Sequence, residues 1–189
     1  AAQRSLTTSL GTVGATHVRF LFGLPFGLIA LAIVAIFAGP IPVPNLPSLA
    51  WGVFGAVAQI GATALMLAAM KERSFVVTTA YTKTEPVQVA LFSVVFLGEH
   101  ISLLLSLAVV IATVGVVLLS WPSRAGGEIF SWRPAILGVV SGGLFALAAV
   151  AFRGAIVALG DADFVAAATV TLAVALAIQS VLLTVWLLL

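Results

Sequence analysis

Long apolar runs separated by short polar breaks make up almost the whole chain. At 1.5 Å per residue, each run is long enough to cross a hydrocarbon layer of about 30 Å as an α-helix. The runs cover residues 15–38, 48–70, 75–97, 101–121, 134–158 and 164–189. The breaks are rich in proline, glycine or charge, as in the segment 39–47, which fits antiparallel helices better than soluble domains. The pattern therefore predicts an all-α, polytopic transmembrane helix bundle.

Composition narrows the class further. The chain is 62% hydrophobic and 7% charged, with a mean hydropathy of +1.28, whereas soluble domains average about 25% charged residues. The isoelectric point near 9.7 does not indicate nucleic-acid binding, because the formal net charge is only +2 and the basic residues do not cluster. The absence of cysteine excludes disulfides and thiolate chemistry. We expect neither a bound metal nor a cofactor.

Two charged residues interrupt the third apolar run. Lys83 lies roughly 12 Å from one end of a helix through 75–97, and Glu85 lies near its centre. Charges at that depth cost several kcal/mol each unless they are paired or face a water-filled cavity. Because residues two apart on a helix point about 200° apart, Lys83 and Glu85 are not expected to pair directly. These two residues are therefore the leading candidates for function.

Prolines are expected to distort two of the helices. Pro86 directly follows Glu85, lacks an N–H, and its ring pushes against the carbonyl of Thr82. A carbonyl freed at membrane depth must be satisfied by protein or by water in a cavity. Pro25 is expected to kink the first run for the same reason.

Polar residues around these positions form a predicted substrate-binding wall. Tyr81 and Glu85 share a helix face at i,i+4 spacing, as do Thr84 and Gln88. The predicted substrate-binding set is Lys83, Glu85, Tyr81, Thr84, Gln88 and Gln59. The alternative is structural: each charge pairs with a neighbouring helix, and polar residues such as Gln179 make interhelical hydrogen bonds.

For several other polar residues, a structural explanation stands beside the functional one. Arg19 is near one end of its run, where snorkelling to the interface explains it and a cavity role is the alternative. Asp161 and Asp163 form a pair that can bind a cation, although carboxylates in a loop are more often simply solvated. Close helix contacts are expected at two small-residue pairs. These are Gly23-x-x-x-Gly27 and Gly138-x-x-x-Gly142.

An internal repeat is visible at an offset of about 149 residues. The matching landmarks are Arg4, Leu10 and Gly11 in one copy and Arg153, Leu159 and Gly160 in the other. The helix boundaries come into register under the same offset. We therefore expect residues 1–121 to form a first repeat that lacks its first helix, and residues 122–189 to begin a second repeat with two helices. Six helices are then visible of ten in a protein of roughly 300 residues.

Several segments resemble a known family. They are Tyr81-Thr82-Lys83-Thr84-Glu85-Pro86, Leu97-Gly98-Glu99, Val114-Gly115-Val116 and Ala15-Thr16-His17-Val18-Arg19-Phe20. Together they resemble the EamA-like branch of the drug/metabolite transporter superfamily, which implies ten helices in two inverted five-helix repeats. The Lys-x-Glu-Pro order is also similar to the sugar-phosphate and nucleotide-sugar branches, and implies that Lys83 helps to bind substrate phosphate. We expect an integral protein of the bacterial inner membrane.

The predicted function is secondary transport of a small polar metabolite by alternating access through a midplane cavity. Glu85 is expected to accept a proton or a substrate amine, and Lys83 to attract a carboxylate or phosphate. The expected partners are the lipid bilayer, the small-molecule substrate and protons, while oligomeric state and membrane orientation stay open. A channel or a non-transporting scaffold is the alternative. An intramembrane enzyme is disfavoured, because His17 and His100 lie near span ends and no His-Glu-x-x-His motif is present.

Overall fold

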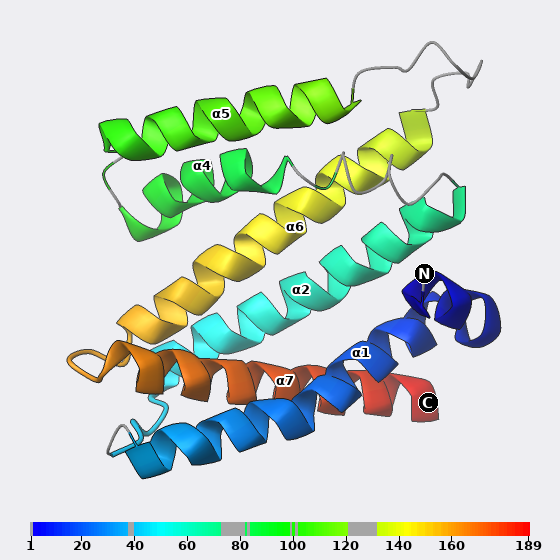
Figure 1. Cartoon of the computed structure of the whole chain (residues 1–189). Coiled ribbons are helices and arrows are strands. Elements are labelled where there is room, and N and C mark those ends of the chain that lie inside the picture. The colour runs from blue at the N-terminus through cyan, green and yellow to red at the C-terminus, as the bar shows by residue number, and fades with distance from the viewer. Residues whose placement is uncertain are drawn as a thin grey trace. The chain divides into compact units, whose positions relative to one another are not determined.

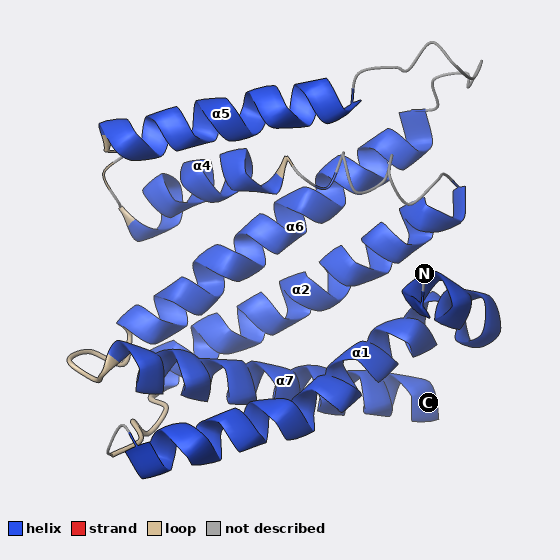
Figure 2. Ribbon diagram, in the orientation of Figure 1, coloured by secondary structure: helices blue, strands red, loops and turns tan. Residues whose placement is uncertain are grey.

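The computed structural model describes residues 2–37, 40–72, 82, 84–98, 100, 102–120 and 132–189. Every regular element in this part of the chain is a helix, as the colouring of Figure 2 shows. The elements are α1 (Ala2–Phe37), α2 (Leu46–Glu72), α4 (Glu85–Leu97), α5 (Leu103–Ser120), α6 (Trp132–Val157) and α7 (Phe164–Leu188). The predicted all-α class is confirmed.

Four helices are long and apolar enough to cross a membrane. The spans are Gly11–Phe37, Leu46–Lys71, Trp132–Val157 and Phe164–Leu188. Their outer faces carry large exposed hydrophobic side chains, such as Phe26 at 72% exposure on α1. Such faces are stable in contact with lipid rather than water, so the polytopic membrane bundle is also confirmed. The other two predicted spans correspond to α4 and α5, which are described over 13 and 18 residues.

The chain divides into two compact units, and the first contains residues 1–60 and 151–189. Within it α1 lies antiparallel to α7, as Figure 1 shows (blue and red to orange). Two glycines of α1 allow this close approach. A Cβ atom on Gly27 would lie 2.8 Å from Leu176 Cδ1, and one on Gly23 would lie 3.2 Å from Leu176 Cδ2. The predicted Gly23-x-x-x-Gly27 contact is therefore present, and its partner is a leucine of α7.

The first unit also pairs the first half of α2 with the end of α6. A Cβ atom on Gly55 would lie 2.7 Å from Phe152 Cε1, and one on Gly154 would lie 2.9 Å from Trp51 Cδ2. In each helix, therefore, a glycine packs against an aromatic ring of the other helix. Trp51 is consequently an interhelical packing residue as well as an aromatic residue near a span end.

The second unit contains residues 61–150. In it α4 packs against α5, and the two lie side by side in Figure 1. The second half of α2 meets α6 through the buried hydroxyl of Ser141, which donates a 2.7 Å hydrogen bond to the carbonyl of Ala62. A hydroxyl buried in an apolar bundle needs such a partner, and this bond fixes the register of the two helices.

Pro86 lies at the start of a helix, whereas Pro25 is not the residue at which α1 departs from helical backbone. Thr84 is the N-cap of α4 and Pro86 occupies its first turn, where a missing N–H leaves no intrahelical hydrogen bond unmade. Pro25 lies inside α1, and the departure from helical backbone in that helix is at Gly11, with φ 73° and ψ 179°. Gly11 and Gly160 both have positive φ, 73° and 69°, a conformation that glycine adopts without strain. These are the two glycines that the predicted repeat aligns.

Candidate functional site

The predicted site residues fall into three groups. Lys83 and Tyr81 lie outside the residues that the structure describes. Thr84, Glu85 and Gln88 lie together at the start of α4 in the second unit. Gln59 lies in the first unit, on the wall of a cavity. The boundary predicted between residues 121 and 122 also falls within the undescribed segment 121–131.

At the start of α4, a short polar network packs on two glycines of α6. Gln88 Nε2 donates to Thr84 Oγ1 at 3.0 Å and to the carbonyl of Val139 at 3.5 Å. A Cβ atom on Gly143 would lie 2.6 Å from Gln88 Oε1, and one on Gly142 would lie 2.9 Å from the Thr82 carbonyl oxygen. The glycine pair therefore lets the polar start of α4 approach the α6 backbone, and only the first of the two glycines was expected to make a close contact.

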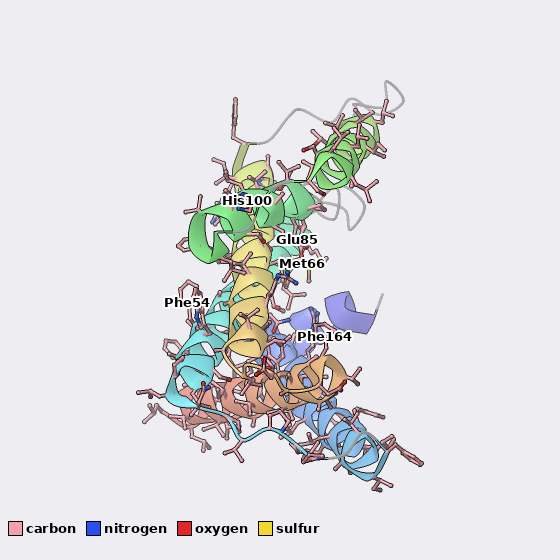
Figure 3. All side chains as sticks on the ribbon, turned by 90° about the vertical axis from the view of Figure 1, so that its left-hand side faces the viewer. Phe54, Met66, Glu85, His100 and Phe164 are labelled. Atoms are coloured by element: carbon pink, nitrogen blue, oxygen red, sulfur yellow. The ribbon has the colours of Figure 1, made fainter. Side chains whose placement is uncertain are left out.

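Glu85 occupies a favourable electrostatic position. It is the first residue of α4, is half-buried, and is labelled at the start of that helix in Figure 3. The unsatisfied N–H groups of a helix N-terminus carry partial positive charge, which stabilises a nearby carboxylate. The helix end thus explains an acidic residue at this position even without a role in substrate binding.

The first unit contains a cavity of about 350 Å³. Apolar side chains from α6 and α7 form part of its wall, including Phe152, Ile156 and Leu176. Its polar lining residues come from three helices: Arg19 from α1, Gln59 from α2, and Thr171 and Gln179 from α7. A mostly apolar pocket with a few convergent polar groups is the usual form of a small-molecule site.

Gln59 and Gln179 are hydrogen-bonded to each other on this wall. Gln179 Nε2 donates to Gln59 Oε1 at 2.6 Å and to the carbonyl of Ala56 at 3.4 Å. Gln179 is 0% exposed, and no donor from the described residues reaches its Oε1 atom. Leaving such a buried acceptor unsatisfied costs about 1–3 kcal/mol. The pair is therefore an interhelical contact, and it leaves Gln179 Oε1 as an acceptor without a donor among the described residues.

Arg19 carries the positive charge of the cavity wall. Its guanidinium carbon lies 5.9 Å from the centre of the Phe20 ring, a distance at which cation–π attraction operates. The Arg19 side chain is exposed although it lines the cavity, and it forms no ion pair with any residue that the structure describes. The structure thus places Arg19 on the cavity wall. From the sequence, a cavity role for Arg19 was the alternative to snorkelling.

The structure also explains Asp163. Its Oδ1 atom accepts hydrogen bonds of 3.0 Å from the backbone N–H groups of Val165 and Ala166, which makes it the N-cap of α7. Within the described ranges, no group of three or more histidine, aspartate or glutamate residues is arranged to hold a metal ion. The helix cap accounts for Asp163 of the predicted Asp161-x-Asp163 pair.

The long apolar helices define a polytopic helical membrane protein, integral to a lipid bilayer. A model of the EamA-like transporter family matches residues 1–121, well over half of the chain. The chain belongs to this family, as its sequence motifs implied, and is a membrane transporter in that general sense. Membership of a transporter family favours transport over catalysis. Neither a curated protein nor a solved structure matched the chain.

Proposed function

We propose that the protein is a secondary transporter that moves a small polar metabolite across the bacterial inner membrane by alternating access. The proposal goes beyond family membership in naming the mechanism and the kind of substrate. It is supported chiefly by the first-unit cavity, where Arg19, Gln59 and Gln179 present polar groups within helices long enough to span a bilayer. Polar residues at such depth are expensive unless they bind one another, water or a solute.

The two-repeat organisation is part of this proposal. The predicted offset aligns α1 with α7, and these helices run antiparallel in the first unit: His17 of α1 is hydrogen-bonded to Thr184 of α7, at 2.9 Å, while Gly27 meets Leu176. Corresponding helices of inverted repeats are expected to run in opposite directions. Residues 1–121 and 122–189 then belong to successive repeats, and rocking of one repeat against the other gives alternating access.

The start of α4 has its own role in the proposal. Glu85 accepts a proton or a substrate amine, and Lys83 attracts an anionic group, with Tyr81, Thr84 and Gln88 as further polar contacts. Glu85 is half-buried at the start of α4, and an intramembrane carboxylate is by default a candidate for binding a proton or a cationic group. A proton gradient is the driving force that such a carboxylate supports.

Transport is tested with the purified chain in proteoliposomes. Saturable counterflow of a labelled metabolite, competed by unlabelled solute, is expected for a secondary transporter. Non-saturable flux would instead indicate a channel, and conversion of the solute would reveal an enzyme. Full counterflow by both Lys83→Ala and Glu85→Gln would show that these residues are not part of the transport site.

A further inference from the structure

One hydrogen-bond acceptor on the wall of the first-unit cavity has no donor among the residues that the structure describes. Gln179 is completely buried, and its Nε2 atom already donates to Gln59 Oε1 and to the Ala56 carbonyl. Its Oε1 atom accepts from no donor in the described part of the chain, although Gln179 lines the cavity. Because a buried acceptor without a donor is costly, a ligand that brings an O–H or N–H group to this atom gains affinity.

A second acceptor lies on the same wall. The hydroxyl of Thr171 donates its proton to the carbonyl of Ala167 at 2.8 Å, so only its oxygen lone pairs remain for a ligand. Thr171 and Gln179 both belong to α7. This side of the cavity therefore favours a solute with hydrogen-bond donors over one that only accepts.

Arg19 favours a solute group that accepts hydrogen bonds, unlike Thr171 and Gln179, which favour a donor. It forms no ion pair with a described residue, and its guanidinium has five N–H donors whose planar arrangement matches a carboxylate. Arg19 lines the cavity, so its guanidinium N–H groups are placed to meet a ligand there. A single guanidinium balances one negative charge, whereas a phosphate monoester carries about −1.5 to −2 at neutral pH.

The size of the cavity limits the solute. Its volume of about 350 Å³ is near the lower end of the range of about 300–1,000 Å³ typical of small-molecule pockets. Phe152, Ile156 and Leu176 line it beside the polar groups, so the body of the solute meets hydrocarbon. A compact molecule with a polar end and an apolar body fits these limits.

We propose that the first-unit cavity binds a compact organic monocarboxylate that also carries a hydroxyl or amino donor. The carboxylate binds Arg19, and the donor binds Gln179 Oε1. The inference rests on the proposed function in taking this solute as the substrate, and it adds Arg19 of α1 and Gln179 of α7 to the residues that recognise the substrate.

Binding is tested apart from transport, on the purified full chain in nanodiscs. The labelled probe is 2-hydroxy-4-methylpentanoate, which has a carboxylate, a hydroxyl and an apolar body. The competitors are 4-methylpentanoate, which lacks the hydroxyl, and 2-hydroxy-4-methylpentanamide, which lacks the charge. Each competitor is expected to bind about tenfold more weakly than the probe. Absence of displaceable probe binding, or equal binding of all three compounds, would overturn the proposal.

Variants assign each preference to one residue. Arg19→Gln is expected to remove the preference for the carboxylate over the amide, and Arg19→Lys to restore much of it. Gln179→Leu is expected to remove the preference for the hydroxy acid over 4-methylpentanoate. The controls are Arg133→Gln, at the exposed start of α6, and Thr169→Val, which removes only a local bond to the Val165 carbonyl. Neither control is expected to change either ratio.

The outcomes separate this inference from the proposed function. Selective binding without counterflow would contradict transport and leave the binding site intact. Counterflow whose substrate preference is unchanged in Arg19→Gln and Gln179→Leu would contradict the site and leave transport intact. If a variant fails to fold, the comparison of the three compounds on the unmodified chain still decides whether the charge and the donor are recognised.

Discussion

Gln179 of α7 donates a 2.6 Å hydrogen bond to Gln59 of α2, which lies 120 residues earlier in the chain. The contact joins two helices at a place where the Gln179 side chain is completely buried, so water does not compete for its amide group. It also fixes the position of the Gln179 amide on the wall of the cavity. The pair therefore links the packing of the first unit to its candidate binding site.

The coupling between these two glutamines is measurable. Gln59→Leu and Gln179→Leu are each expected to destabilise the protein, and the double variant to be about 0.6 kcal/mol more stable than the sum of the single effects predicts, because the hydrogen bond is lost only once. Unfolding in mixed detergent, followed by circular dichroism, gives the four free energies. Strict additivity would show that the bond contributes no measurable stability.

Gly27→Ala is expected to impair both stability and ligand binding. Its Cβ atom would lie 2.8 Å from Leu176 Cδ1, so the leucine must move, and Leu176 also lines the cavity. We expect a loss of about 1–3 kcal/mol, typical of overpacking, with weaker binding of the hydroxy acid probe. The matched control is Gly115→Ala on α5, where no described atom lies within 4 Å of the new Cβ. That change is expected to be neutral or stabilising, because alanine favours helix.

The two neighbouring glycines of α6 are expected to differ in their tolerance of alanine. At Gly142 the new methyl meets a backbone atom, the Thr82 carbonyl oxygen at 2.9 Å, which cannot move without shifting the chain. At Gly143 it meets the end of the Gln88 side chain, which can rotate away. Gly142→Ala is therefore expected to cost about 1–3 kcal/mol and Gly143→Ala less than about 1 kcal/mol. Thermal unfolding of the two variants in the same detergent tests the order, and the reverse order would contradict this account of the packing.

Asp163→Ala is expected to destabilise the start of α7 by about 1 kcal/mol, because two backbone N–H groups lose the acceptor that caps them. Asp163→Ser should retain most of the stability, since serine is also a good N-cap. Asp161→Ala, two residues earlier in the same loop, serves as the control. If the Asp161 and Asp163 variants lowered the melting temperature equally, the loss of charge and not the loss of the cap would be responsible.

Much of the candidate site was predictable residue by residue, but its assembly was not. The sequence singled out Gln59 and Gln179 because polar groups in apolar spans are expensive, and it gave a cavity role for Arg19 as the alternative to snorkelling. It gave no sign that the three share a cavity, since they lie on different helices far apart in the chain. Of the strongest sequence signal, Lys83 lies outside the described residues, and Glu85 lies at the start of α4, where the helix N-terminus offers a local reason for the acidic residue.

The sequence by itself determined the all-helical membrane class, the positions of the six helices within a few residues, apart from the starts of the first and the third, and membership of the EamA-like transporter family. These properties depend on the length and apolarity of contiguous segments and on local motifs, which are independent of how the helices pack. Only the tertiary structure decided which helix faces meet. The glycines that receive Leu176 and Phe152 set those contacts. The cavity beside them brings together a guanidinium without an ion pair and an amide oxygen without a donor, as judged among the residues that the structure describes.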